Sequence, residues 1–253
     1  MRCRDCHLVY TSPVLFPSAN PYLEHEQDHY FTHDRAAKIA SGVSLARDAE
    51  RLLGRKGRLL ELGCGRGDLL VGAAREGWSV RGIEWTPAFA DVAGDVEIEI
   101  ASVDAAKSLD ETYDVLILAA ILEHLYEPEP CLRRVHRALV PRGLVFIDVP
   151  NECSLWSGLG NAYMRLRGRD WVVNLSPTFP PFHVVGFCPR SLRHLLAATG
   201  FEVVELETHR WQNELPRQTG LIGRIERMGM DAALSLGARL GMGAGITCWA
   251  RRA

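Results

Sequence analysis

The stretch Arg58-Leu-Leu-Glu-Leu-Gly-Cys-Gly-Arg-Gly-Asp-Leu-Leu70 decides the fold of this chain. Its first part is an apolar run typical of a buried parallel strand, which we expect over residues 58–62. Three glycines, Gly63, Gly65 and Gly67, then lead into a helix that we expect over residues 68–76. A strand, a glycine loop and a helix in this order form the edge of a nucleotide-type pocket, because backbone N–H groups and the helix N-terminus approach the ligand there.

Acidic side chains around this loop indicate the kind of ligand. Glu61 lies two residues before the first glycine, and Asp68 stands where the dinucleotide fingerprint requires its third glycine. These carboxylates would repel a pyrophosphate and attract a ligand with an ammonium and a sulfonium group, such as S-adenosylmethionine. Glu84 ends the next apolar run, at the separation where an acid binds ribose hydroxyls. The alternatives are a loop that binds nothing and a dehydrogenase with an altered fingerprint.

The motif Glu61-Leu-Gly-Cys-Gly-Arg-Gly67 resembles the first motif of class I S-adenosylmethionine-dependent methyltransferases. Residues 113–128, residues 137–151 and the segment Phe201-Glu-Val-Val also resemble that family, so the likeness covers most of residues 35–208 in the expected order. The resemblance implies a Rossmann-like α/β fold. Its sheet would be mostly parallel and seven-stranded, with helices on both faces and an antiparallel last strand.

Length and composition suit one such domain. The chain has 253 residues, 47% of them hydrophobic and 24% charged, which is ordinary for a globular protein with one large core. The net charge of −2 predicts no general attraction to nucleic acid or to an anionic membrane. No apolar run is long enough to cross a bilayer, and the seven cysteines are scattered. We therefore expect a cytoplasmic protein with reduced thiols and no membrane span.

Further apolar runs and turn residues divide the chain into the remaining elements. We expect an N-terminal arm over residues 1–34 and a methyltransferase domain over residues 35–253. Within the domain, residues 151–188 read as a lid inserted over the acceptor, and residues 209–244 as a helical insertion before the last strand. The expected helices cover residues 35–54, 128–139 and 191–199, and the expected strands cover residues 79–84, 96–101, 113–118, 144–149, 201–206 and 245–250.

The N-terminal arm carries half of a zinc knuckle. Cys3 and Cys6 have the spacing of one ligand pair, but a closed zinc site needs four ligands. Some members of the resembled family carry another such pair upstream, so the segment resembles the remnant of a zinc ribbon. In that family an aromatic arm also folds over the cofactor, which makes Tyr30 and Phe31 the candidates for a lid.

The resemblance places the cofactor against residues from the loop, the strand ends and the arm: Glu61, Gly63, Cys64, Gly65, Gly67, Glu84, Trp85, Asp104, Ala105, Ala119 and Tyr30. Asp104 would accept a hydrogen bond from the adenine amino group, with the Ala105 N–H against the ring, or Asp104 is an ordinary solvated acid. Trp85 would stack on the adenine or fill the core. The small side chain of Ala119 would leave room for the methionine arm.

Two histidines are the candidates for catalysis. His124 follows the strand end at which open α/β sheets place their ligands, and the resemblance puts His183 just before the last long helix. Either can orient the acceptor or take its proton, or else hold a loop by hydrogen bonds. No set of metal ligands is expected around them. Arg165, Arg167 and Arg169 would grip an anionic acceptor or form a solvated basic turn.

The sequence thus predicts methyl transfer from S-adenosylmethionine to a small-molecule acceptor, with O-methylation ahead of N- or C-methylation. One alternative is a non-catalytic subunit that binds S-adenosylmethionine and activates a partner enzyme. Another is an NAD-dependent oxidoreductase, which Asp68 and the missing third glycine disfavour. The helical stretch in residues 209–244 would complete the acceptor cavity or pack on a second copy of the chain as a homodimer.

Overall fold

The computed structural model describes residues 1–12, 35–87, 96–169, 172–178, 181–210 and 220–253. The lid candidates Tyr30 and Phe31 lie outside the described residues. The described elements, in chain order, are β1 Val9–Tyr10, α2 Arg35–Leu53, β2 Arg58–Leu62, α3 Asp68–Arg75, β3 Ser79–Glu84, β4 Ile98–Ile100, the 3-10 turn η2 Lys107–Asp110, β5 Tyr113–Ala119, the 3-10 turn η3 Leu122–His124, α5 Pro128–Ala138, β6 Leu139–Pro150, α6 Leu155–Leu166, β7 Val185–Gly186, α7 Pro189–Ala198, β8 Phe201–His209, α8 Gly220–Arg239 and β9 Gly245–Arg252.

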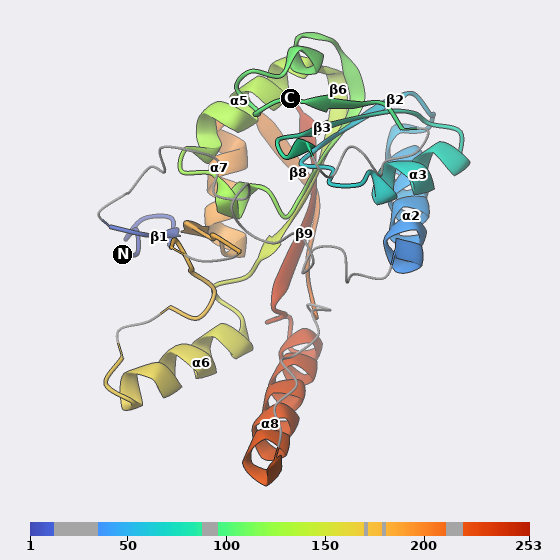
Figure 1. Ribbon diagram of the computed structural model, residues 1–253. Coiled ribbons are helices and arrows are strands. Elements are labelled where there is room, and N and C mark those ends of the chain that lie inside the picture. Colours follow the sequence, from blue (N-terminus) through green and yellow to red (C-terminus); the bar gives the residue numbers. More distant parts are fainter. Residues whose placement is uncertain (13–34, 88–95, 170–171, 179–180, 211–219) are drawn as a thin grey trace.

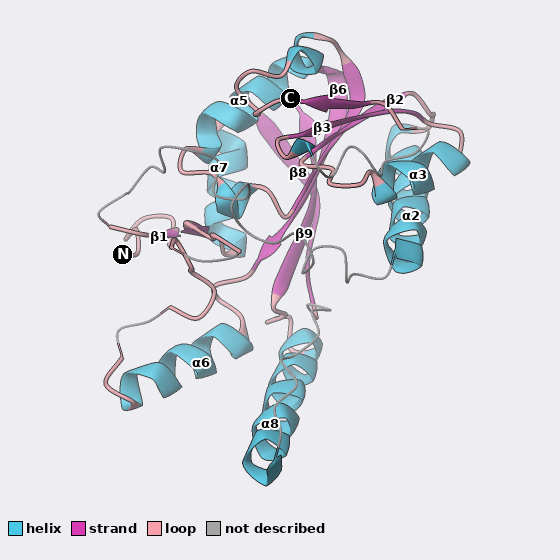
Figure 2. Ribbon diagram, viewed as in Figure 1, coloured by secondary structure: helices cyan, strands magenta, loops and turns pink. Residues whose placement is uncertain are grey.

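A twisted seven-stranded sheet forms the centre of the protein (Figure 2). Its strand order is β4-β3-β2-β5-β6-β9-β8, and β9 runs opposite in direction to the other strands of this sheet. The order reverses direction at β2, so the carboxyl ends of β2 and β5 border the crevice in which doubly wound sheets bind ligands. The Rossmann-like prediction with an antiparallel last strand is confirmed.

Helices cover both faces of the sheet (Figure 1). On one face, α5 and α7 bury Leu132, Val135 and Leu192 in the larger apolar core. On the other face, α2 and α3 bury Ala46 and Leu70 in a second core. The central strand β5 is buried along its length except at Ala119, which explains why its sequence is a nearly continuous apolar run.

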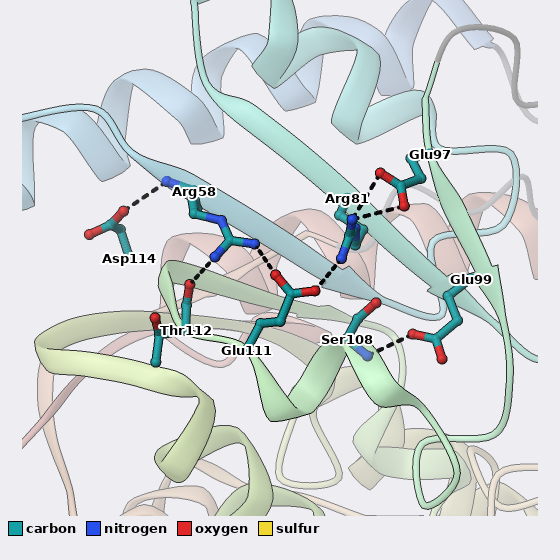
Figure 3. Close-up of polar contacts among 8 residues, drawn as sticks. All are labelled: Arg58, Arg81, Glu97, Glu99, Ser108, Glu111, Thr112 and Asp114. Atoms are coloured by element: carbon teal, nitrogen blue, oxygen red, sulfur yellow. Dashed lines mark hydrogen bonds and ion pairs between the residues drawn. The ribbon is translucent and has the colours of Figure 1, made fainter.

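Ion pairs tie the strands together at the end of the sheet opposite the glycine loop (Figure 3). The Glu111 carboxylate bridges the guanidinium groups of Arg58 on β2 and Arg81 on β3. Asp114, at the start of β5, accepts a hydrogen bond of 2.7 Å from the Arg58 backbone N–H. These contacts fix the relative register of neighbouring strands and therefore the positions of their carboxyl ends.

The first inserted segment is more regular than the sequence indicated, and the second contains a helix, as predicted. Residues 151–188 contain the helix α6, and residues 209–244 contain α8, which contacts α6 (Figure 1). Several large apolar side chains on these helices are exposed: Leu159, Tyr163, Leu166, Met228 and Leu236. The strand β8 extends to His209, three residues beyond its expected end. In the described residues, no helix is both long and apolar enough to span a bilayer.

The first residues of the chain fold against the domain. The strand β1 pairs antiparallel with β7, and the Cys3 N–H donates to the Leu8 carbonyl oxygen at 2.8 Å. Cys3 and Cys6 therefore lie in a tight hairpin turn. The Cys188 thiol approaches the Cys6 carbonyl oxygen at 3.9 Å, so this hairpin rests on the start of α7.

A buried acid near this hairpin predicts a pH dependence of stability. Burial raises the pKa of Glu152 from its usual value to about 7, and the Asn174 side chain offsets this only in part. Between pH 4.5 and 7 the folded chain therefore holds a proton that the unfolded chain releases, so the free energy of unfolding falls as the pH rises. In wild type this fall in the free energy of unfolding should amount to up to about 3 kcal/mol between pH 4.5 and 7, and we expect it to be absent in Glu152→Gln.

Urea unfolding of wild type and Glu152→Gln at a series of pH values measures the effect. Replacement of an exposed strand carboxylate, Glu207→Gln, is the control and should leave the wild-type slope unchanged. Parallel pH profiles for Glu152→Gln and wild type would show that Glu152 is ionised in the folded protein.

Candidate active site

The glycine loop folds as the sequence predicted. Gly63, Gly65 and Gly67 have φ values of 65°, 54° and 71°, in the left-handed region that favours glycine. The Gly63 and Cys64 N–H groups donate to the Ile83 carbonyl oxygen at 2.8 and 3.1 Å, which holds the loop against β3. Among the residues that the structure describes, a Cβ atom on Gly65 would meet no atom within 4 Å, so the backbone there faces open space. The buried Cys64 side chain packs at Gly82, which leaves its backbone as the part available to a ligand.

Two carboxylates line this loop. The Glu84 Oε2 atom accepts the Gly65 N–H at 2.8 Å, and its Oε1 atom accepts the Thr86 N–H at 2.8 Å. Glu61 is buried, and its Oε2 atom has no hydrogen-bond partner among the described residues. Burial and the nearby charges of Glu84 and Asp68 raise the pKa of Glu61 well above its usual range, against the opposing charge of Lys38. An ammonium group bound here would pair with this carboxylate.

Asp68 differs from the prediction. It is buried at the start of α3, and its two oxygens pair with Arg35 Nε at 3.1 Å and Arg66 Nη2 at 2.9 Å. These guanidinium groups neutralise the carboxylate that the sequence analysis assigned to the negative rim. The acids that remain for a cationic ligand are therefore Glu61 and Glu84.

The residues expected around the adenine lie at the ends of β3 and β4. Trp85 is 45% exposed, so the core-filling alternative for this side chain is wrong. Asp104 and Ala105 are also exposed, and the Ala105 N–H donates to the Ser102 carbonyl oxygen at 3.1 Å. Arg134 binds the carbonyl oxygens of this loop and so fixes its path. An adenine contact from the Ala105 N–H would require that hydrogen bond to be shared.

Ala119 is the last residue of β5, the strand that borders β2 on the side opposite β3. The next residue, Ala120, has a φ of 56°, and its N–H donates to the Asp148 carbonyl oxygen of β6 at 2.8 Å. A positive φ is uncommon for a residue with a Cβ atom and occurs often at functional sites. The chain thus turns sharply between β5 and η3, as the placement of a ligand over this edge requires.

The two candidate catalytic histidines lie together. The Val184 N–H donates to the Glu123 carbonyl oxygen at 2.9 Å, which brings the segment before β7 against η3. The ring centroids of His124 and His183 are 4.8 Å apart, and the Nε2 atom of each lies 3.9 Å from Glu123 Oε1. The sequence analysis expected no set of metal ligands here, but one ligand atom from each of these three residues lies within 4.8 Å of the others.

The protonation states in this cluster follow from burial. Burial raises the pKa of Glu123 to about 8, and burial together with the proximity of His183 lowers the pKa of His124 to about 3. Burial also lowers the pKa of His183, whose Nδ1 atom is hydrogen-bonded to the Asn174 carbonyl oxygen at 3.0 Å. That bond places the His183 proton on Nδ1 and leaves the Nε2 lone pair facing Glu123.

A second polar pair near this edge was missed by the sequence analysis. His209 Nε2 lies 3.0 Å from Asp148 Oδ1, and this contact raises the pKa of His209. The signal was available, since both residues lie at or near the ends of predicted strands. Arg165, Arg167 and Arg169 are exposed at the end of α6, and Arg167 donates to the Tyr163 hydroxyl at 2.8 Å.

The sheet order, the glycine loop and the buried acids define a class I S-adenosylmethionine-dependent methyltransferase fold. The family model described as "Methyltransferase domain" matches residues 31–206. The chain therefore belongs to this methyltransferase family.

Curated relatives and solved structures agree with this assignment. The ubiquinone biosynthesis O-methyltransferase of Pseudomonas syringae pv. tomato is 32% identical over 130 residues, which are 47% of this chain and 53% of that protein. The protein of the same name from Bartonella tribocorum is 23% identical over 197 residues, 74% of this chain and 78% of its own. The chain thus spans about half the length of the first of these relatives.

Among solved structures, a SAM-dependent methyltransferase from Archaeoglobus fulgidus has a TM-score of 0.60 at 19% identity and covers 92% of this chain and 100% of its own. The plantazolicin methyltransferase BpumL in complex with SAH has a TM-score of 0.59 at 13% identity, and the match covers 89% of this chain and 88% of BpumL. At such identities these structures support the fold alone.

Proposed function

We propose that this protein is a cytoplasmic enzyme that transfers a methyl group from S-adenosylmethionine to a hydroxyl group of a small molecule. The observation that carries the proposal is the pair of histidines, His124 and His183, whose rings meet beside Glu123 beyond the carboxyl end of β5. Membership of the methyltransferase family favours this activity over the oxidoreductase alternative.

The loop residues fit this cosubstrate. The open backbone at Gly65 would lie along the ligand, and the Glu61 carboxylate, whose Oε2 atom has no hydrogen-bond partner among the described residues, would accept its ammonium group. Glu84 would accept the ribose hydroxyls in addition to its two backbone bonds. Trp85, Asp104 and Ala105 would surround the adenine, and Ala119 would leave space for the methionine arm. These roles, with those of Gly63, Cys64 and Gly67, are part of the proposal.

The acceptor would lie over Ala119 and the histidine cluster. The relatives from Pseudomonas and Bartonella are named as O-methyltransferases of ubiquinone biosynthesis, which favours a hydroxyl acceptor. A hydroxyl must lose its proton as its oxygen is methylated, and the cluster of Glu123, His124 and His183 meets this need. The Nε2 lone pair of His183 can accept the proton directly, and a cation held in the cluster would instead stabilise the oxygen anion.

S-adenosylmethionine, when bound, supplies a methyl group on a sulfonium that leaves as a neutral thioether. The protein's own contribution is to align the acceptor oxygen with that methyl group and to exclude water. The acceptor O–H bond breaks as the O–C bond forms, and the histidine cluster receives or displaces the proton. Glutamine has a size similar to that of histidine but lacks the basic ring nitrogen. His183→Gln should therefore slow the reaction with phenols by a factor of about 100.

A panel of phenols, alcohols and amines tests the proposal, with the S-adenosylhomocysteine formed and the product mass as readouts. An O-methylated product from a phenol or an alcohol is expected. A product methylated only on nitrogen or carbon would contradict the hydroxyl assignment. Turnover that appears only after a copurifying protein is added back would instead support the partner-subunit alternative.

Replacement of Glu84 tests the ribose contact. We expect Glu84→Ala to weaken S-adenosylhomocysteine binding about 100-fold, because it removes the ribose acceptor and frees the Gly65 N–H. Glu84→Gln keeps one acceptor oxygen and should lose less. Isothermal titration measures both, with Glu207→Gln on an exposed strand position as the control. Unchanged affinity in Glu84→Ala would overturn the assignment.

A further inference from the structure

Three groups able to bind a metal ion meet at one point in the described part of the chain. Glu123 and His124 come from η3, and His183 comes from the segment before β7. Their ligand atoms all lie within 4.8 Å of one another, and both Nε2 atoms are 3.9 Å from the same Glu123 oxygen. His183 is far from Glu123 and His124 in the sequence, and the fold alone brings it to them.

The orientation of the side chains favours a cation over a simple hydrogen-bonded cluster. The Nδ1 atom of His183 is bonded to the Asn174 carbonyl oxygen, and a backbone contact of this kind typically fixes the tautomer of a metal-bound histidine. His124 is likewise hydrogen-bonded to backbone, at Pro181 and Phe182. Both imidazoles therefore have a fixed position while their Nε2 atoms face the carboxylate.

The carboxylate itself is unsatisfied. Glu123 is 1% exposed, and neither of its side-chain oxygens has a hydrogen-bond partner among the described residues. A buried carboxyl group without a hydrogen-bond partner is costly, and here the Nε2 atoms of two imidazoles lie close to it. The nearby Asp148 adds negative charge, although His209 pairs with it at 3.0 Å. A cation at this point would satisfy all three groups at once.

We propose that Glu123, His124 and His183 bind a divalent transition-metal ion, with Zn²⁺ as the best match to two imidazoles and one carboxylate. Bonds of about 2.0–2.1 Å to such an ion put neighbouring ligand atoms about 3.4 Å apart, so small side-chain rotations would close the set. The histidine side chains remain 18% and 16% exposed, which gives the ion a side of entry and leaves a coordination position open.

This proposal deepens the proposed function and rests on it for the role of the ion. An acceptor hydroxyl at the open position would bind the cation through its oxygen, and the positive charge would lower the pKa of that hydroxyl. The proton would leave to water, the oxygen would attack the methyl carbon, and the carbon–sulfur bond would break. The two histidines would then act as ligands in place of a proton acceptor.

Zinc binding by the intact chain tests the site without any acceptor. The protein is stripped with a chelator, dialysed and titrated with Zn²⁺ in competition with a chromophoric zinc indicator. The Cys3→Ser/Cys6→Ser double variant serves as the background, because the N-terminal thiols can also bind zinc. We expect one zinc ion per chain in this background. His183→Gln should weaken the binding more than 100-fold, since loss of a ligand should exceed the 10–100-fold typical of outer-shell partners.

Two controls complete the test. His209→Gln replaces a histidine outside the set and should bind zinc as the background does. Co²⁺ substitution should give an absorption spectrum without a thiolate charge-transfer band, and such a band would overturn the site. Undetectable zinc binding in the background variant, or equal binding in His183→Gln, would also overturn it. S-adenosylhomocysteine affinity and O-methyl products are measured separately, so failure of the metal site and failure of the proposed function remain distinguishable.

Discussion

Gly65→Val is expected to reduce S-adenosylhomocysteine affinity by about two orders of magnitude, or about 2.7 kcal/mol. Gly65 has a φ of 54°, and a Cβ atom added there would meet nothing within 4 Å among the described residues. It would instead occupy the space in which we propose that the ligand lies along the backbone. Isothermal titration of wild type and variant gives the two dissociation constants.

The chain offers a closely matched control at Gly54. This glycine follows α2, has a φ of 75°, and a Cβ atom there also meets nothing within 4 Å. Gly54→Val therefore introduces a similar backbone strain at a place remote from the loop. It should lose a similar free energy of unfolding and bind S-adenosylhomocysteine normally. Equal binding by both variants would show that no ligand approaches Gly65.

Gly72→Ala is expected to lower the free energy of unfolding by about 3 kcal/mol, at the upper end of the usual effect of overpacking. The helices α2 and α3 cross with their backbones in contact. A Cβ atom on Gly72 would lie 2.2 Å from the Ile39 carbonyl oxygen, and one on Gly42 would lie 2.1 Å from the Leu69 carbonyl oxygen. Because backbone atoms cannot rotate away, the helices would have to separate.

Urea unfolding measures this loss, and Gly158→Ala is the matched control. Gly158 is an exposed glycine in α6, where a Cβ atom would meet nothing within 4 Å. Alanine has the higher helix propensity, so this variant should gain up to about 1 kcal/mol. A Gly72→Ala protein as stable as wild type would mean that α2 and α3 do not cross so closely.

The strand–loop–helix motif could be read from the sequence because its glycines and apolar run act locally. The positive φ values of Gly63, Gly65 and Gly67, and the buried strand β2 before them, are set by the nearest residues. The antiparallel β9 was also predictable, since the family resemblance carried the topology.

Long-range pairing was the part that the sequence could not give. Asp68 looked like a free acid, but Arg35, which lies in α2, pairs with it in the folded chain. Likewise, His183 meets Glu123 and His124 only through the contact of β7 with η3. Neither contact could be predicted from neighbouring residues in the sequence, because tertiary packing brings the partners together from different elements.

A crystal structure of the protein with S-adenosylhomocysteine tests the central claim most directly. We predict ligand density along the backbone of Gly65, with the ammonium group near Glu61, the ribose at Glu84 and the adenine beside Trp85. Density at another edge of the sheet, or a glycine loop that stays empty at saturating ligand, would contradict it.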